Sequence, residues 1–361
     1  MSAQKQFIDT FSQAPQAVGR AWGRVNLIGE HLDYNGGLVL PAPIERSMHV
    51  AIALSEPEGN LNTDQFCSNC FDGLAVRSPE FELQGNWSDY AAASLALARE
   101  LGLLSQTVKL AIYSDIPHGA GVSSSAALIV ATLRAVIALK DGKANVDATT
   151  IAQWAQRVEN QYIGVPCGIM DQIAVSVTEL GQAIALDTNT LQHSIIALPT
   201  EVHFSVVFSG LTRQLDEGRY AVRRQECEQA AAQLGVSYLC KMNAAQSQSI
   251  EQLATPLKQR ARHVYSEQQR VLAAVEALSQ NNIAEFGELM NQSHESMRDD
   301  FEITVPEIDR LVESCRQYGA VGARMTGGGF GGCIVACVPK ADFVPWSQQV
   351  LAVHPAASIV C

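Results

Sequence analysis

The sequence predicts an α+β fold of two lobes, and three observations support this prediction. The chain has 361 residues, a length that favours about two domains. With 47% hydrophobic and 17% charged residues, it can bury a large core. Strand-like alternation and helix-like apolar periodicity both occur in each half, so neither half is purely helical or purely β. We place the boundary at Asp187, which gives an N-terminal lobe of residues 1–186 and a C-terminal lobe of residues 187–361.

The N-terminal lobe begins with predicted strands. Apolar and polar residues alternate over Gly23–Gly29 and lead into a turn, and Leu38–Pro41 and Met48–Leu54 also have strand patterns. Alternation returns over Thr107–Tyr113, and an apolar helical period follows over Ser123–Lys140. A glycine-containing loop therefore connects a strand to a helix.

A second helix is predicted in the same lobe over Thr149–Ile163, with Thr149 or Thr150 as its N-cap. A loop rich in glycine, proline and cysteine follows over Gly164–Gly168. The apolar run Ala183–Leu186 ends the lobe.

The C-terminal lobe is predicted to mix both kinds of element. Val202–Phe208 and Cys333–Val338 have strand patterns. Tyr220–Leu234 and Leu257–Leu278 are amphipathic, and Val305–Tyr318 is a helix that Pro306 opens and Gly319 stops.

Charge and composition exclude several classes of protein. The formal charge of −12 argues against nucleic-acid binding, which needs a basic face. The longest apolar stretch, Ala127–Leu139, contains Arg134 and is shorter than the ~20 residues that span a bilayer. Residues 1–20 show no apolar signal region, so we expect a cytoplasmic protein without a membrane partner. The nine cysteines are scattered, and Cys67 and Cys70 lack the second pair that a structural zinc site requires.

The loop before the helix at Ser123–Lys140 is a candidate phosphate-binding site. Its small residues let backbone N–H groups approach an anion at the helix N-terminus. Its three serine hydroxyls can cap the helix, bind phosphate oxygens or give Mg²⁺ a hard oxygen ligand. A flexible loop with ordinary serine caps is the alternative. The loop residues are Gly119, Ala120, Gly121, Val122, Ser123, Ser124 and Ser125.

A second glycine-rich loop, Gly327–Gly332, formally matches the dinucleotide fingerprint G-x-G-x-x-G. That fingerprint requires a helix after the loop and an acidic residue about twenty positions later, whereas here a strand pattern follows and no such residue occurs. A nucleotide-dependent oxidoreductase would depend on this match alone. The loop is either a structural turn or a close backbone approach to a ligand, since glycine serves both uses.

The turn Gly29–Gly37 is unusually dense in hydrogen-bonding side chains, with Glu30, His31, Asp33 and Asn35. Sugar hydroxyls both donate and accept, so a mixture of carboxylate, imidazole and amide groups suits a polyol site. The alternative is a solvated polar turn.

Two further carboxylates have structural explanations when each is taken alone. Asp171 follows the Gly/Pro/Cys loop among apolar neighbours and could cap a helix. Glu159 lies within a predicted helix and could face solvent. A partner such as Mg²⁺ would give Glu159 a function.

Three motifs together resemble the galactokinase branch of the family of small-molecule kinases that also includes homoserine, mevalonate and phosphomevalonate kinases. Their order and spacing fit the family across nearly the whole chain. They read GRVNLIGEHLDYNGG from Gly23, PHGAGVSSSAA from Pro117 and GARMTGGGFGG from Gly322. Further similar stretches are ENQYIGVPCGIMDQ from Glu159, YAVRRQECE from Tyr220 and SHESMRDDFEITVPEIDRL from Ser293.

The resemblance implies ATP-dependent phosphorylation of the anomeric (C1) hydroxyl of galactose, giving galactose 1-phosphate. It implies an α+β, two-lobed fold with a left-handed βαβ unit in the N-terminal lobe. That lobe would carry the phosphate loop and the catalytic aspartate, and the mixed α/β C-terminal lobe would complete the sugar and nucleotide cleft. The implied partners are only the sugar and Mg-ATP, and we expect a monomer.

The resemblance also implies roles for particular residues. Asp171 would take the proton from the sugar hydroxyl and Arg24 would stabilise the charge, which suits phosphoryl transfer. Ser125 and Glu159 would ligate Mg²⁺. The implied sugar-binding residues are Glu30, His31, Asp33, Gly168 and Tyr220, and the implied ATP phosphate-binding residues run from Gly119 to Ser125.

The chain departs from the family pattern beside the implied sugar site. Leu32 stands where the family usually has threonine, and Glu217–Ala221 replaces a Gly-Ser-Glu-Tyr-Asn stretch. A kinase of galacturonate, N-acetylgalactosamine or arabinose is therefore an alternative, and Arg219 would suit a carboxylate if it pointed inward. A non-catalytic sugar and ATP sensor is a further alternative, although such sensors can lack the Ser125-Ala126 pair that is intact here.

Overall fold

The computed structural model describes residues 2–55, 62–117, 119–140, 145–165, 167–211 and 217–361. Its chain divides into two compact units, and the division is not at the predicted residue 186/187 boundary. The second unit starts at Thr178 and also takes in Val25–Pro43 and His118–Val122. The first unit consists of Met1–Arg24, Ile44–Pro117 and Ser123–Val177.

A five-stranded sheet forms the centre of the first unit. β3 pairs antiparallel with β6, and β6 pairs parallel with β4. Because α2 lies in the chain between β4 and β6, these elements form a βαβ unit, as the family resemblance predicts; its left hand stays a prediction. The strands in sheet order are β1 (Ala17–Asn26), β3 (Pro41–Leu54), β6 (Val108–Ser114), β4 (Asp64–Ser68) and β5 (Ala75–Arg77).

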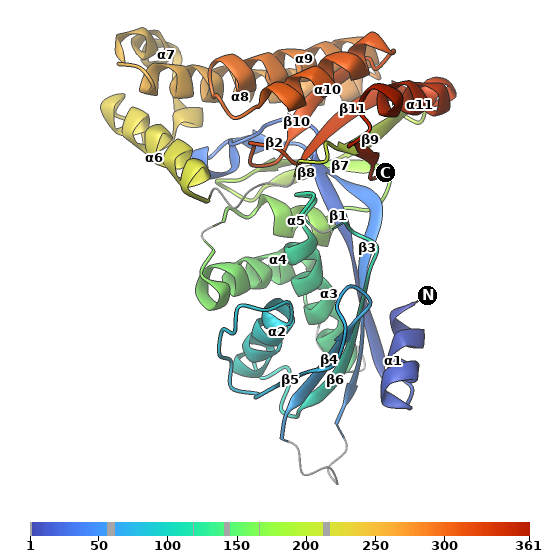
Figure 1. The fold of residues 1–361 in the computed structure, drawn as a ribbon. Helices are drawn as coiled ribbons and strands as arrows, with labels where there is room; N and C mark the ends of the chain where they lie inside the picture. The colour runs from blue at the N-terminus through green and yellow to red at the C-terminus, as the bar shows by residue number, and fades with distance from the viewer. Residues whose placement is uncertain (1, 56–61, 118, 141–144, 166, 212–216) are drawn as a thin grey trace. The chain divides into compact units, whose positions relative to one another are not determined.

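Helices cover both faces of this sheet (Figure 1). On one face, Phe7 of α1 (Ala3–Phe11) packs fully buried against Ala51, Ala53 and Ala111. These alanines alternate with the side chains of the other face, as the two-residue period of a strand requires. The helices on the other side are α2 (Asp89–Glu100), α3 (Ser124–Ala138), α4 (Ala148–Arg157) and α5 (Met170–Val177).

The predicted helix Thr149–Ile163 differs from the structure in its start and in its last turn. The N-cap is Asp147, whose Oδ1 accepts from the backbone N of Thr150 at 2.9 Å. The predicted threonine caps are therefore wrong, because an aspartate two to three residues earlier accepts the hydrogen bond from the Thr150 N–H. The α-helix ends at Arg157, and Val158–Ile163 form a π-helix, a geometry that is frequent at functional sites.

The second unit contains two antiparallel sheets. In one, β10 (Gly322–Thr326), β11 (Cys333–Pro339), β9 (Val202–Phe208) and β12 (Ser358–Ile359) are neighbours in that order. The other consists of β2 (Leu38–Val39), β7 (Gln182–Asp187) and β8 (His193–Ala197). The predicted strand Val202–Phe208 is confirmed, and so is the strand that follows the second glycine loop.

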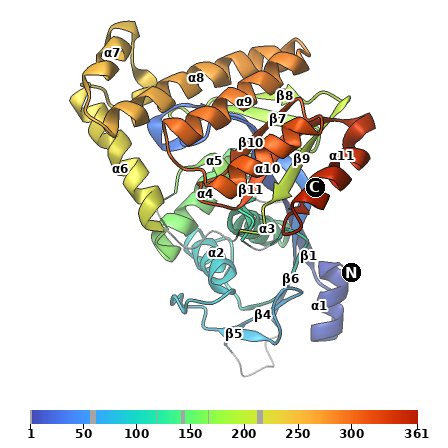
Figure 2. The same cartoon turned by 45° about the horizontal axis from the view of Figure 1, so that its top comes forward.

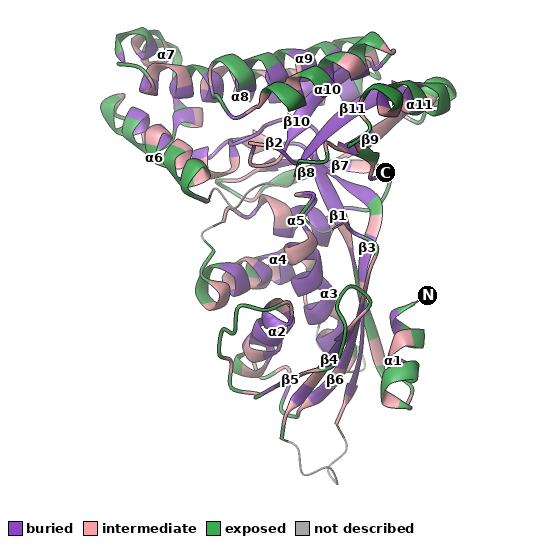
Figure 3. Cartoon of the chain, in the orientation of Figure 1, coloured by how far each residue is buried: buried purple, intermediate pink, exposed green. Residues whose placement is uncertain are grey.

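Helices α8, α9 and α10 of the second unit pack on these sheets with one side exposed, and α6 packs against α8, whereas β10 and β11 are buried (Figures 2 and 3). α9 approaches β10 closely, because a Cβ on Gly322 would lie 2.3 Å from the carbonyl oxygen of Gly287. The helices are α6 (Glu217–Gln233), α7 (Ala244–Gln248), α8 (Leu257–Ser279), α9 (Ile283–Asp299), α10 (Pro306–Gln317) and α11 (Phe343–Val353). Short 3₁₀ helices are η1 (Asp33–Asn35), η3 (Leu239–Lys241), η4 (Ser249–Gln252) and η5 (Lys340–Asp342). Within the described ranges, none of the helices is both long and apolar enough to cross a bilayer.

Candidate active site

Arg24 and Asp171 form a two-pronged ion pair in the first unit. Arg24 Nε donates to Asp171 Oδ1 at 2.8 Å, and Arg24 Nη2 donates to Oδ2 at 2.5 Å. Strand β1 carries the arginine and the first turn of α5 carries the aspartate. The arginine side chain is 7% exposed and the aspartate side chain 31%. The carboxylate is thus held at a fixed angle while part of it remains accessible.

The serine loop contributes a third contact to Asp171. Ser123 Oγ donates to Asp171 Oδ2 at 2.6 Å and makes no capping bond to α3. Ser123 has φ 62°, and Gly119 and Gly121 have φ 72° and 74°, so the segment before α3 repeatedly uses the left-handed region. Ser123 is therefore a partner of the aspartate in this structure and not a helix cap.

A second carboxylate, that of Glu159, pairs with the third serine of the loop, Ser125. Ser125 Oγ donates to Glu159 Oε1 at 2.8 Å, and Gln172 Nε2 donates to Glu159 Oε2. Glu159 is buried, at 6% exposure, so the solvent-facing alternative is wrong. Burial raises the pKa of the Glu159 carboxyl, and the negative charge of Asp171 adds to this effect. Sequence reasoning missed Gln172, although it directly follows Asp171 in the chain.

Cys167 lies beside Glu159 as well. Its thiol is 3.5 Å from Asn160 Oδ1 and 3.7 Å from Glu159 Oε2, and its backbone N donates to Asn160 Oδ1 at 2.9 Å. Burial raises the pKa of the Cys167 thiol, and the Glu159 charge raises it further. The sulfur is therefore a neutral thiol at neutral pH. The next residue, Gly168, is half-buried just before α5.

The donor set at Ser125 and Glu159 fits Mg²⁺. A hydroxyl and a carboxylate are the hard oxygen ligands that Mg²⁺ takes, and it usually binds one or two protein groups together with substrate phosphates and waters. The part of the chain that the structure describes holds no group of three or more His, Cys, Asp or Glu side chains arranged for a metal ion. The remaining ligands of a metal at Ser125 and Glu159 would therefore come from a bound nucleotide and water.

The predicted polyol turn lies in the second unit, and its Glu30 is firmly held. Glu30 is 2% exposed. Its Oε1 accepts from the backbone N of Gly327, and its Oε2 accepts from Asn26 Nδ2. The turn is therefore tied to the second glycine loop, and the alternative of a solvated turn is wrong for this residue.

Aromatic rings surround His31 in the same unit. The ring centroid of His31 is 4.8 Å from that of Phe301 and 5.2 Å from that of Tyr220. His31 Nδ1 is 2.8 Å from the hydroxyl of Tyr34. The structure thus brings two predicted sugar-binding residues, His31 and Tyr220, together with Tyr34 and Phe301. Aromatic faces commonly pack against sugars, but nothing in the sequence pattern singled out Phe301.

The departures from the family pattern have structural counterparts. Leu32 is fully buried, at 0% exposure, and therefore belongs to the core. Asp33 begins the 3₁₀ turn η1 and is half-buried. The guanidinium of Arg219 lies 4.1 Å from the ring centroid of Phe330, a cation–π contact. Arg219 is thus stacked on the second glycine loop.

The second glycine loop joins two antiparallel strands, β10 and β11. It lacks the helix of the dinucleotide fingerprint, which removes the basis for an oxidoreductase. Backbone bonds hold it in place: Phe330 N donates to Ile303 O at 2.7 Å, and Gly332 N donates to Leu211 O at 3.0 Å. Hydrogen bonds within the second unit therefore hold the loop, and the backbone N of its first residue, Gly327, donates to Glu30.

A buried histidine under the polyol turn predicts a pH-dependent stability. His263 Nε2 is 3.3 Å from Glu30 O and Nδ1 is 2.9 Å from Ser296 Oγ. Burial lowers the pKa of the His263 imidazole to about 4, with Glu267 raising it and Arg270 and Arg324 lowering it. Between pH 6.5 and 4 the unfolded chain binds a proton that the folded chain does not, so stability falls as the pH falls.

We therefore expect the free energy of unfolding to drop by about 3 kcal/mol across that interval because of this group. Urea denaturation at stepped pH measures the drop, and His263→Gln should flatten it. An equal slope in the parent and in H263Q between pH 6.5 and 4 would contradict the assignment.

Three family models match the chain. Residues 89–179 match the GHMP kinases N terminal domain, residues 274–343 match the GHMP kinases C terminal model, and residues 5–54 match the galactokinase galactose-binding signature. The last range contains Arg24 and the polyol turn. Together the models define a class, the GHMP kinases.

Similar proteins and one solved structure identify the branch of the GHMP kinases to which the chain belongs. A galactokinase of Clostridium perfringens is 39% identical over 95% of this chain and 91% of its own length. A galactokinase of Haemophilus influenzae is 39% identical over 97% of this chain and 92% of its own length. The crystal structure of Lactococcus lactis galactokinase complexed with galactose matches 99% of this chain and 95% of its own, with a TM-score of 0.88 and 30% identity. This chain belongs to the galactokinases of the GHMP kinase family.

Proposed function

We propose that this chain transfers the γ-phosphoryl group of ATP to the C1 hydroxyl of galactose, producing galactose 1-phosphate and ADP. Galactose as the substrate is supported by the similarity to the galactokinases of Clostridium perfringens and Haemophilus influenzae and to the galactose complex of the Lactococcus lactis galactokinase. One observation carries the chemistry: Asp171 is fixed by Arg24 and Ser123, while Ser125 and Glu159 pair beside it in the same unit.

Asp171 is the proposed base, and Arg24 the proposed charge-stabilising residue. The base must accept the proton of the C1 hydroxyl as that oxygen attacks phosphorus. Arg24 holds both carboxylate oxygens, so the carboxylate cannot rotate away from the hydroxyl. Phosphoryl transfer depends mostly on positioning and electrostatics, and a two-pronged guanidinium supplies both.

The sugar is recognised by the polyol turn and the aromatic cluster in this proposal. Glu30 and Asp33 accept hydrogen bonds from hydroxyls, and His31 and Tyr220 present their rings. Gly168 offers backbone without a side chain. Its proximity in sequence to Asp171 places it among the proposed sugar contacts.

The phosphates of ATP are held by the loop Gly119–Val122 and the serines that open α3. Backbone N–H groups at a helix N-terminus favour an anion. Ser125 and Glu159 would hold Mg²⁺, which when bound neutralises charge on the phosphate oxygens. Ser124 adds a hydroxyl donor to the same end of the helix, and Ser123, whose hydroxyl donates to Asp171, adds its backbone N–H.

The test is a coupled ADP-release assay with Mg-ATP across galactose, N-acetylgalactosamine, galacturonate, arabinose, glucose and mannose. We expect galactose to lead in kcat/KM by ~100-fold or more, well beyond a marginal binding difference. This expectation follows because the Leu32 side chain is buried in the core and the Arg219 guanidinium is stacked on Phe330. A lead by galacturonate would instead implicate Arg219, and no turnover with any sugar would leave only a sensor.

A further inference from the structure

Helix α8 holds the backbone of the polyol turn at three points. Glu267 Oε1 accepts from the backbone N of Gly29 at 2.9 Å, and Gln268 Oε1 accepts from the backbone N of Leu38 at 2.9 Å. One turn earlier in the helix, His263 Nε2 lies 3.3 Å from Glu30 O. Two consecutive side chains of α8, Glu267 and Gln268, thus bond the backbone where the turn begins and directly after it ends. This turn carries the proposed sugar-binding residues.

Glu267 is the most heavily bonded of these groups. It is fully buried, at 0% exposure. Besides the bond from Gly29, its Oε1 accepts from Ser293 Oγ at 2.7 Å, and its Oε2 accepts from Arg270 Nε at 2.7 Å. A carboxylate with this many donors has one orientation available, so it can fix the backbone to which it is bonded.

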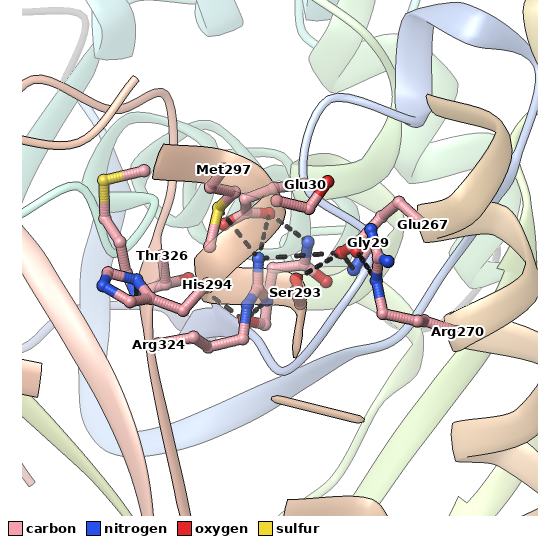
Figure 4. A network of polar contacts seen from close by, with 12 residues as sticks. Gly29, Glu30, Glu267, Arg270, Ser293, His294, Met297, Arg324 and Thr326 are labelled. Atoms are coloured by element: carbon pink, nitrogen blue, oxygen red, sulfur yellow. Dashed lines mark hydrogen bonds and ion pairs between the residues drawn. The ribbon is translucent and has the colours of Figure 1, made fainter. Parts of the chain in front are cut away.

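Arg324 links Glu267 to Glu30 (Figure 4). Its Nη2 lies 3.9 Å from Glu267 Oε1 and 4.0 Å from Glu30 Oε2. Its Nη1 donates to Asn26 O at 3.3 Å, and its side chain is 0% exposed. The guanidinium is therefore close to two carboxylates. Glu30 is a proposed sugar-binding residue, and Glu267 has no role in the proposed function.

The cluster of Glu30, Glu267, Arg270 and Arg324 has no net charge only while Glu267 is ionised. Glu30 and Glu267 bring two negative charges, and Arg270 and Arg324 bring two positive charges. Burial raises the pKa of the Glu267 carboxyl, but Arg270 and Arg324 outweigh burial and lower that pKa to about 2. At neutral pH Glu267 is charged. Without that charge, Arg324 would have Glu30 as its remaining acidic neighbour among the described residues.

We propose that Glu267 is a positioning residue for galactose: it fixes Gly29 directly and, by neutralising Arg324, leaves the Glu30 carboxylate aligned for a sugar hydroxyl. This inference rests on the proposed function. Removing the Glu267 charge draws Glu30 towards Arg324, which remains as its positively charged neighbour, so galactose binding weakens. Loss of binding that is equal in the ground state and the transition state raises KM and leaves kcat unchanged.

The decisive variant is Glu267→Gln, which keeps the side-chain length and an acceptor for Gly29 but removes the charge. We expect the KM for galactose to rise about tenfold or more, with kcat and the KM for ATP close to those of the parent. Calorimetry with galactose alone should show the same weakening of Kd. Ser293→Ala removes one hydrogen-bond donor to Glu267 Oε1. It should also raise the KM and Kd for galactose, by a smaller factor.

Asp64→Asn is the matched control. Asp64 is 1% exposed and pairs with Arg99 at 2.7 Å in the first unit, so this variant also breaks a buried ion pair. It should lower the melting temperature and leave the KM for galactose unchanged. If E267Q fails to fold, S293A decides by the same two readouts.

The outcomes separate the two claims. A parent protein that neither binds nor phosphorylates galactose overturns the proposed function and, with it, the inference. An active parent whose E267Q variant keeps its galactose KM, or raises the KM of galactose and ATP alike, overturns only the role of Glu267. A selective rise in the galactose KM, absent from Asp64→Asn, supports it.

Discussion

Asp171→Asn should abolish most turnover while leaving the chain folded and able to bind galactose. The amide cannot take the proton of the C1 hydroxyl, and loss of a general base typically lowers kcat by about 10²–10⁴-fold. The amide also offers one acceptor oxygen where Arg24 now has two, so the guanidinium is less firmly held. ADP release measures kcat, and calorimetry with galactose shows that the sugar site persists.

The control for this variant is Asp64→Asn, which leaves every proposed catalytic group in place. It should keep the parent kcat even where its melting temperature falls. Substantial turnover by D171N, within about tenfold of the parent and so short of the loss that a general base predicts, would show that proton transfer to Asp171 is not required. Catalysis would then depend on Arg24 and the phosphate loop alone.

Glu159→Gln should reduce activity and at the same time preserve or increase stability. The carboxylate is buried, and its hydrogen-bond partners among the described residues, Ser125, Gln172 and Cys167, are uncharged. A buried negative charge without a basic partner disfavours folding, and the neutral amide removes that charge. We expect kcat at low Mg²⁺ to fall by about 100-fold or more, because loss of a group that only orients a metal ligand already costs about 10–100-fold.

A Mg²⁺ titration distinguishes the proposed ligand from a packing residue. Added Mg²⁺ should partly restore E159Q, because the remaining phosphate and water ligands still bind the metal. Glu100→Gln removes an exposed carboxylate of the same unit, paired with Arg157 at 2.5 Å, and should leave the Mg²⁺ dependence unchanged. A fall in both stability and activity of E159Q, with no response to Mg²⁺, would contradict the proposal.

Local patterns were sufficient for much of the fold. The alternation over Val202–Phe208 predicted the strand exactly where it lies, and Pro306 and Gly319 bracketed α10 to within a residue or two. These features depend on residues that are close together in the chain, so the sequence alone can reveal them. Two lobes were predicted, but the interleaving of their segments was not, because it depends on contacts between distant parts of the chain.

The same distinction applies to the residues of the candidate site: those in local motifs were predicted, and those marked only by their contacts were not. Asp171, Arg24 and Glu159 were predicted through the family motifs, and their close contacts are observed in the structure. Gln172 and Phe301 were missed, because an amide or a phenyl ring has no chemistry that marks it until its partner is known. Glu267 lies 237 positions from Glu30, and only the fold brings both carboxylates close to the same nitrogen of Arg324.

The interleaved course of the chain has a consequence for biosynthesis. Val25–Pro43 leave the ribosome early but belong to the second unit, where their bonding partners include Glu267 and Gly327. A nascent chain must therefore keep this polar turn without these partners until Glu267 and then Gly327 have been synthesised, a long-range closure that slows folding. Expression of residues 1–186 alone would yield a turn that lacks its bonds to Glu267 and Gly327, so this fragment would carry proposed sugar-binding residues without two of the groups that hold them.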